Sequence, residues 1–135
     1  MATMDVQWLR EALRAAGYEV TDVGDGSGVR ANHPKRPNVI ARVRDTLGII
    51  TFQHYWRRKK GLLRSDGAFR TAVGEANSKS WLSTFYIDHE GDLGVSSYIY
   101  ITDGLQPGDI DRFLEKEAEL FTNVAIASGL VAHLQ

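Results

Sequence analysis

Three carboxylates alternate in residues 88–92, which read Asp-His-Glu-Gly-Asp, and alternating carboxylates supply the oxygen ligands of calcium loops. A calcium loop of the helix-loop-helix type needs about 12 residues with a ligand at its end. Here Leu93 already opens an apolar run, so the segment is predicted to be a polar hairpin turn. The chain has no cysteine, and its histidines are scattered without two at a metal-ligand spacing: His33, His54, His89 and His133. We therefore predict no metal site and no cofactor.

No group of residues has the pattern of a catalytic centre. The chain lacks the Gly-x-Ser-x-Gly sequence that positions a nucleophilic serine, and Asp88 beside His89 in a turn does not make a triad. The glycine-rich residues 24–28 are similar to a phosphate-binding loop, but residues 29–32 after them have strand character instead of opening a helix. We predict a turn there and a non-enzymatic protein, with a small enzyme of unrecognised site as the remaining alternative.

A run of cations is the strongest candidate for an anion-binding site, and it consists of Arg57, Arg58, Lys59 and Lys60. Tyr55 and Trp56 precede it, and basic side chains interleaved with aromatic rings can neutralise phosphates and stack on bases. Such a run also keeps a strand end solvated. The pI of about 6.4 is low for a nucleic-acid-binding domain. Nucleic-acid binding is therefore the alternative function rather than the favoured one.

Charge is divided unevenly along the 135 residues, although the formal net charge is only −1. Residues 30–70 hold 11 basic and two acidic side chains, whereas residues 71–135 hold three basic and ten acidic ones. A basic middle and an acidic end give the molecule a dipole. In a homodimer, the basic middle of one copy would face the acidic end of the other.

The composition, with 43% hydrophobic and 24% charged residues, is typical of a globular protein, and we predict one domain over residues 1–135. No apolar run reaches the length of a membrane span. Residues 1–5 lack the basic and then apolar pattern of a signal peptide. We therefore expect a cytoplasmic protein with no membrane partner.

A predicted hairpin over residues 81–101 organises the chain. Trp81, Phe85 and Ile87 fall on one side of its first strand, and Leu93, Val95, Ile99 and Ile101 fall on one side of its second, which is the period of strands with one buried face. Four further strands are predicted near residues 18–23, 29–32, 39–44 and 49–56. Helical periodicity marks residues 4–16, a helix opened by Ser65 or Asp66 and closed by Asn77, and a long helix from residues 107–109 onward.

These elements predict an α+β fold in the order α-β-β-β-β-α-β-β-α, with a twisted antiparallel sheet of five to six strands and helices packed on it. Four aromatic side chains fall outside the strand faces that we assign to the core, and aromatic side chains often anchor protein interfaces. The predicted partner-binding residues are Trp56, Tyr86, Tyr98 and Tyr100. A helix that covers this face is the alternative explanation.

The element order and residues 76–93 resemble the YbjN family, described as bacterial sensory-transduction regulators. The resemblance rests on a helix that ends at Asn77, an aromatic-rich strand, an Asp-x-x-Gly-Asp-Leu turn from Asp88 to Leu93, a second strand and a closing helix. That family is similar in fold to the type III secretion chaperones, which are typically homodimers. The resemblance implies a non-enzymatic, chaperone-like adaptor or regulator that holds a segment of a partner polypeptide, and it supplies no catalytic residue.

Overall fold

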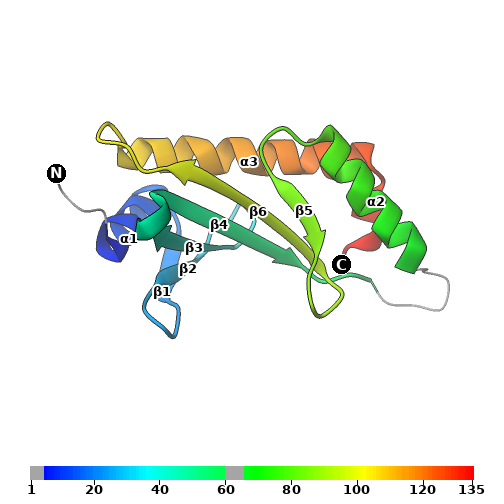
Figure 1. Ribbon diagram of the computed structural model, residues 1–135, viewed down its shortest axis with the longest axis horizontal. Helices are drawn as coiled ribbons and strands as arrows, with labels where there is room; N and C mark the ends of the chain where they lie inside the picture. The colour runs from blue at the N-terminus through cyan, green and yellow to red at the C-terminus, as the bar shows by residue number, and fades with distance from the viewer. Residues whose placement is uncertain (1–4, 60–65) are drawn as a thin grey trace.

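A computed structural model describes residues 5–59 and 66–135 of the chain. Three helices and six strands appear in the predicted order (Figure 1). The helices are α1 (Val6–Ala15), α2 (Asp66–Lys79) and α3 (Pro107–Ala127). The strands are β1 (Glu19–Asp22), β2 (Gly28–Asn32), β3 (Val39–Arg44), β4 (Ile49–Trp56), β5 (Thr84–Ile87) and β6 (Leu93–Tyr100), with short 3-10 helices at Asp45–Leu47 and Leu130–His133. The predicted fold class is confirmed.

The six strands form one sheet in the order β1-β2-β3-β4-β6-β5, and every neighbouring pair is antiparallel. The three helices lie on one face, which we call the inner face (Figure 1). Along β4, Ile50, Phe52 and His54 are buried on this face, whereas Tyr55 is exposed on the opposite, outer face. The alternation follows from the period of two residues in an extended strand.

Two apolar clusters fill the space between the sheet and the helices. The first joins α1 and the beginning of α3 to β2, β3 and β4, and the second joins α2 and the end of α3 to β5 and β6. Both clusters contain residues of the long helix α3, as its long apolar stripe requires. The N-terminus of α1 also agrees with the sequence, because Asp5 caps this helix by accepting a hydrogen bond from the Trp8 amide.

Two predictions for residues 77–81 were wrong. Trp81 does not belong to β5, because Ser80 and Ser83 hydrogen-bond each other and form a turn that keeps residues 80–83 out of the strand. The Trp81 side chain is 94% exposed. Asn77 does not close α2 in a left-handed conformation, because the helix continues to Lys79 and no described residue other than glycine has a positive φ.

Asn77 instead binds the outer edge of β5. Its side-chain amide donates to the Phe85 carbonyl oxygen at 2.7 Å and its side-chain oxygen accepts from the Phe85 amide at 2.8 Å. These two bonds replace the hydrogen bonds that a further strand would make at this edge.

Candidate functional site

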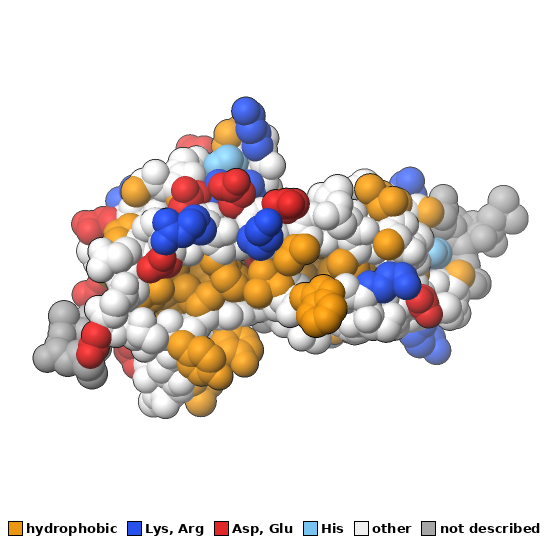
Figure 2. All heavy atoms as spheres, turned by 90° about the horizontal axis from the view of Figure 1, so that it is seen from above, with side chains coloured by type: hydrophobic (Ala, Val, Ile, Leu, Met, Phe, Trp, Pro, Cys, Tyr) orange, Lys and Arg blue, Asp and Glu red, His pale blue; other side chains and the backbone are white. Residues whose placement is uncertain are grey.

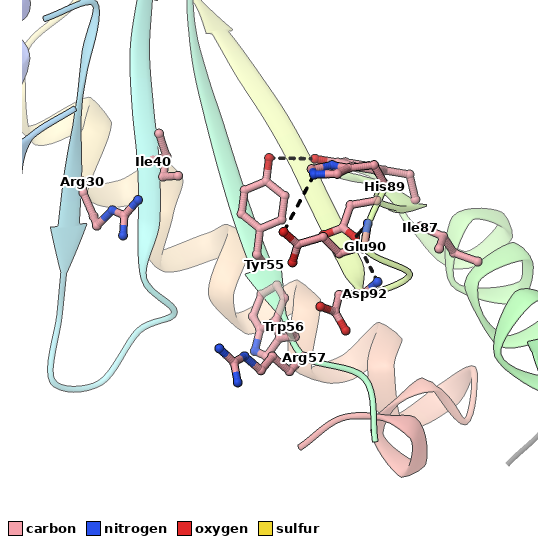
Figure 3. Close-up of a pocket in the computed structure, with 11 residues that line it drawn as sticks. Arg30, Ile40, Tyr55, Trp56, Arg57, Ile87, His89, Glu90 and Asp92 are labelled. Carbon is pink, nitrogen blue, oxygen red and sulfur yellow. Dashed lines mark hydrogen bonds and ion pairs between the residues drawn. The ribbon is translucent and has the colours of Figure 1, made fainter. Parts of the chain in front are cut away.

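The outer face of the sheet is hollowed in several places. A hollow of about 810 Å³ lies between β2 and the turn of residues 88–92. Figure 3 shows Arg30, Ile40 and Tyr55 on three neighbouring strands at one side of this hollow, and His89 and Glu90 at the other. Arg57 closes the hollow where β4 ends (Figure 3).

The hydroxyl end of the Tyr86 ring lies against Gly94, which is directly opposite it on β6. A methyl group at position 94 would lie only 2.3 Å from a Tyr86 ring carbon, so glycine is required for this arrangement. The Tyr86 hydroxyl donates to the Tyr55 hydroxyl at 3.4 Å. Burial of the ring, and then the hydrogen bond to Tyr55, raise the pKa of Tyr86 well above its ordinary value.

The segment of residues 88–92 forms the predicted polar turn. The Asp88 carboxylate accepts hydrogen bonds from the amides of Glu90 and Asp92, each at 2.9 Å. Asp92 in turn accepts from the Arg58 amide at 2.9 Å. These carboxylates are therefore occupied by backbone donors of the turn and of the neighbouring strand end.

The predicted cationic run divides into residues with different surroundings. Arg58 is used for packing, because its side chain is 13% exposed, forms an ion pair with Asp66 and lies over the Phe69 ring at 4.8 Å. Arg57 and Lys59 are exposed. Lys60 lies outside the described residues. The run therefore does not present four equivalent cations to a ligand.

Trp56, which we expected outside the core faces, packs against the core. Its ring stacks on Phe121 of α3 with the ring centroids 4.1 Å apart. The reason is the period of β4, since residue 56 follows Phe52 and His54 on the inner face. Tyr86 is half-buried on the outer face, as described above.

Tyr98 and Tyr100 remain exposed on the outer face, by 53% and 65%. Their rings make an edge-to-face contact with centroids 5.6 Å apart, and a hydrogen bond to Tyr100 raises the pKa of Tyr98. They belong to the part of β6 that has a neighbour on one side only, because β5 pairs with β6 only as far as Ser96. We call residues 97–100 the free half of β6.

A buried polar chain, which the sequence did not reveal, connects α3 to the sheet. His54 Nε2 lies 2.6 Å from Glu117 Oε1, and Ser83 Oγ donates to Glu117 Oε2 at 2.9 Å. His54 Nδ1 donates to the carbonyl oxygen of Asn38 at 2.9 Å, since a carbonyl can only accept. The short distance between Nε2 and Oε1 marks a hydrogen bond between the two buried side chains.

The hydrogen-bonded series of Ser83, Glu117 and His54 differs from a catalytic triad in its order. A triad places the histidine between the acid and the nucleophile, whereas here the carboxylate of Glu117 lies between Ser83 and His54. His54 and Glu117 are also buried, with exposures of 5% and 2%. The signal in the sequence was an acid on the apolar stripe of the long helix and a histidine on the apolar side of a strand.

The described residues contain no group of three His, Cys, Asp or Glu side chains able to hold a metal ion. Within the same part of the chain, no helix is long and apolar enough to cross a membrane.

Comparison with known proteins agrees with this architecture. The crystal structure of YbjN from E. coli, described as "a putative transcription regulator", matches with a TM-score of 0.74 and 12% sequence identity over 100% of this chain and 98% of that one. At this identity the likeness shows the fold alone. No curated protein matches the sequence. A family model matches residues 5–122, and its description is "Putative bacterial sensory transduction regulator". The chain therefore belongs to the YbjN family.

Proposed function

We propose that this chain is a non-enzymatic regulatory domain that holds an extended segment of a partner polypeptide along the free half of β6. The observation that carries the proposal is the unequal length of two paired strands. β6 extends over eight residues, whereas β5 extends over four. Residues 97–100 therefore lack a described strand neighbour on the side opposite β4.

The backbone groups on that side can be assigned. The Ile101 amide donates to the Gly48 carbonyl oxygen at 2.8 Å, so residue 101 turns its backbone groups toward the β4 side. Because these groups alternate along an antiparallel strand, those of Tyr98 and Tyr100 point to the unpaired side. An added strand would use these amides and carbonyls for its main-chain hydrogen bonds.

The open side of β5 and the open side of the free half of β6 differ in their protection. At β5, the Asn77 side chain occupies the edge through its two hydrogen bonds with Phe85. No comparable side-chain bond to the backbone of residues 97–100 occurs among the described residues. An edge that is left unprotected next to a protected one favours a binding role.

The surroundings of the free half are apolar. Tyr98 and Tyr100 border it on the outer face, the exposed Trp81 lies in the turn that precedes β5, and Ile99 packs inward against the first core cluster. Figure 2 shows apolar side chains gathered in a band along the α3 side of the molecule, with acidic and basic side chains beside the band. An added strand with alternating apolar residues would bury this surface on both of its faces.

Two observations support a non-enzymatic role. The family description names a regulator, and the buried chain of Ser83, Glu117 and His54 has the wrong order for nucleophilic catalysis and is shielded from solvent. Both observations support a binding domain, and neither identifies its partner.

The test captures polypeptides from a lysate of the source organism, in the presence of nuclease and at moderate salt, and then measures amide hydrogen exchange of this chain with the captured polypeptide. We expect the exchange of Tyr98 and Tyr100 to slow, while Ile99, whose amide faces β4, changes little. Unchanged exchange at both tyrosines would overturn the site. Protection that rises with the concentration of the chain alone would identify a second copy as the occupant and support the expected homodimer instead.

Two variants separate the backbone from the ring. Tyr98→Pro removes the outward amide, which an edge strand tolerates, and is expected to abolish capture. Tyr98→Ser removes the same ring but keeps the amide, and is expected to weaken capture without abolishing it. Thermal unfolding of both variants shows whether the sheet is intact.

A further inference from the structure

A line of tyrosines runs along β4, β5 and β6 on the outer face, and the polypeptide proposal uses only its two members on the free half of β6, Tyr98 and Tyr100. In the register of the sheet, Tyr100 is opposite Ile49, Tyr98 is opposite Thr51, and Tyr55 and Tyr86 lie to either side of Gly94. Between the second and the last of these rows lie Gln53 and Ser96, which are opposite each other. Successive rows on one face are about 7 Å apart, because they are separated by two residues of strand.

Arginines follow the same rows on β2, β3 and the end of β4. Arg44 shares its row with Ile49 and Tyr100, Arg42 shares its row with Tyr98, and Arg30 lies opposite Ile40 in the row of Gln53. Arg57 continues the series beyond Tyr55.

The ion pairs of the described residues leave most of these cations free. Arg42 is held by the Ser27 hydroxyl and lies near Asp25. The side chains of Arg30, Arg44 and Arg57 form no hydrogen bond or ion pair in the described part of the chain. Three unpaired guanidinium groups on one face are a place for anions.

Hollows join the two series into one trough. A hollow of about 290 Å³ touches Arg44, Tyr98 and Gln53, and a hollow of about 190 Å³ touches Gln53, Arg30 and Tyr55. The third is the hollow of about 810 Å³ in Figure 3, which Arg30 and Tyr55 also line and which ends at Arg57. Gln53 connects the first two hollows, and Arg30 with Tyr55 connects the last two.

We propose that this trough binds a short single-stranded nucleic acid, with phosphates at Arg30, Arg44 and Arg57 and with bases against Tyr98 and Tyr55. Aromatic rings stack on any unpaired base, and arginines neutralise the backbone beside them. Gln53 and Ser96 offer hydrogen bonds to a base between the two tyrosines. From position 49 to position 57 the trough is about 26 Å long, which suits about four nucleotides.

The acidic residues that line the trough belong to the hollow that ends at Arg57, and the other two hollows are lined by no acidic residue of the described chain. At that end, Asp88 accepts hydrogen bonds from the amides of Glu90 and Asp92 in the turn, and Asp92 accepts one from the Arg58 amide. Asp25 accepts from Ser27 and balances Arg42. The low overall charge of −1 means that attraction depends on the local arginines. Bases must be unpaired to reach the tyrosines, so a duplex is disfavoured.

The experiment measures fluorescence anisotropy of labelled eight-nucleotide DNA and RNA strands of mixed sequence, and of the matching DNA duplex, between 50 and 200 mM salt. We expect both single strands to bind more tightly than the duplex. With three arginine contacts, the logarithm of the association constant should fall with a slope of about −2 against the logarithm of salt, a loss of about 20-fold over this range. The DNA and RNA arms identify which of the two strands the trough prefers.

Substitutions locate the binding on the outer face. Arg30→Gln should reduce the salt slope by about 0.7, whereas Arg70→Gln, the same change at an exposed position on α2, should leave it unaltered. Tyr55→Ser should weaken binding at least about fivefold and Tyr55→Phe, which keeps the ring, should not. Thermal unfolding confirms that each variant is folded.

Absence of single-strand binding at 50 mM salt, equal binding of the duplex, or equal effects of Arg30→Gln and Arg70→Gln would each overturn the proposal. Salt-insensitive binding of a polypeptide that Arg30→Gln weakens would assign the trough to that partner. The result is independent of the free half of β6, because Trp81→Ser should reduce capture of a polypeptide and leave nucleic-acid binding unchanged.

Discussion

The two faces of β4 share one backbone and differ in what covers them. On the inner face, Ile50, Phe52 and His54 lie under the helices and are buried. On the outer face, Thr51, Gln53 and Tyr55 have no helix over them and line hollows. Stability and binding are therefore divided between alternate residues of the same strand. Changes on one face should therefore alter unfolding, and changes on the other should alter association.

The largest loss of stability is expected at the buried hydrogen bonds of Glu117 on the inner face. Glu117→Ala removes the carboxylate that contacts both His54 and Ser83. The polar atoms of these two side chains then lose their hydrogen-bond partner inside the core. We expect the free energy of unfolding to fall by about 3–5 kcal/mol. Equilibrium unfolding in urea measures this loss.

The matched control replaces both members of the pair. A protein with His54→Leu and Glu117→Leu has no unpaired charge in the core, so it should lose less stability than either single substitution. A loss in the double variant equal to the sum of the single losses would show that the two side chains act independently, contrary to the hydrogen-bonded pair described above.

The outer face has one well-packed place, and a substitution there should have the next largest effect. Gly94→Ala puts a methyl group into the Tyr86 ring, and displacement of the ring is expected to cost about 1–3 kcal/mol of unfolding free energy. Adding Tyr86→Ser should recover most of the loss, since the clash partner is removed. Stability unchanged by Gly94→Ala would mean that Tyr86 leaves its place over Gly94 without cost.

A smaller effect is expected at Tyr98, which is exposed on the same face. Tyr98→Ser should change the free energy of unfolding by about 0.5 kcal/mol or less, whereas Phe52→Ala on the inner face should cost about 3–5 kcal/mol. Thermal unfolding of the two variants compares the faces directly. A large loss of stability in Tyr98→Ser would place this tyrosine in the structural core and argue against both binding proposals that use it.

The strand periodicity predicted most of this division. It placed Phe85, Leu93 and Val95 on the buried side, and all three are buried. The periodicity also held inside β4, but the aromatic character of Trp56 suggested an interface, and only the stack on Phe121 of α3 shows its packing role. The prediction that Trp81 lies in a strand was wrong, because a local turn between Ser80 and Ser83 precedes β5. Side-chain to backbone hydrogen bonds of this kind compete with strand pairing.

Contacts between distant segments could not be predicted from a single sequence. Glu117 and His54 are 63 positions apart, and neither carries a local signal of the other. Asn77 was expected to end a helix, because asparagine often does so. Its role at the edge of β5 depends on how α2 is placed beside that strand. The rows of tyrosine and arginine on the outer face likewise depend on strand pairing, and they follow only once the register is known.

The finest difference between the faces is in the titration of the tyrosines. Burial and the hydrogen bond to Tyr55 raise the pKa of Tyr86, so it should ionise at a higher pH than a tyrosine in water. Tyr55→Phe removes the hydrogen-bond partner and should lower the pKa of Tyr86, though not to the ordinary value, because the burial over Gly94 remains. The ultraviolet absorbance of tyrosinate, followed as the pH is raised, measures each ionisation.

The sign of the linked effect on stability can be stated. The pKa of Tyr86 is higher in the folded chain than in the unfolded chain, where it is about 10. Its contribution to stability is therefore complete below about pH 10 and is lost as the pH rises from there through the folded pKa. In Tyr55→Phe the loss should extend over a narrower pH range. A titration of Tyr86 that is the same with and without the Tyr55 hydroxyl would show that the two hydroxyls do not interact, and that burial against Gly94 alone sets the pKa.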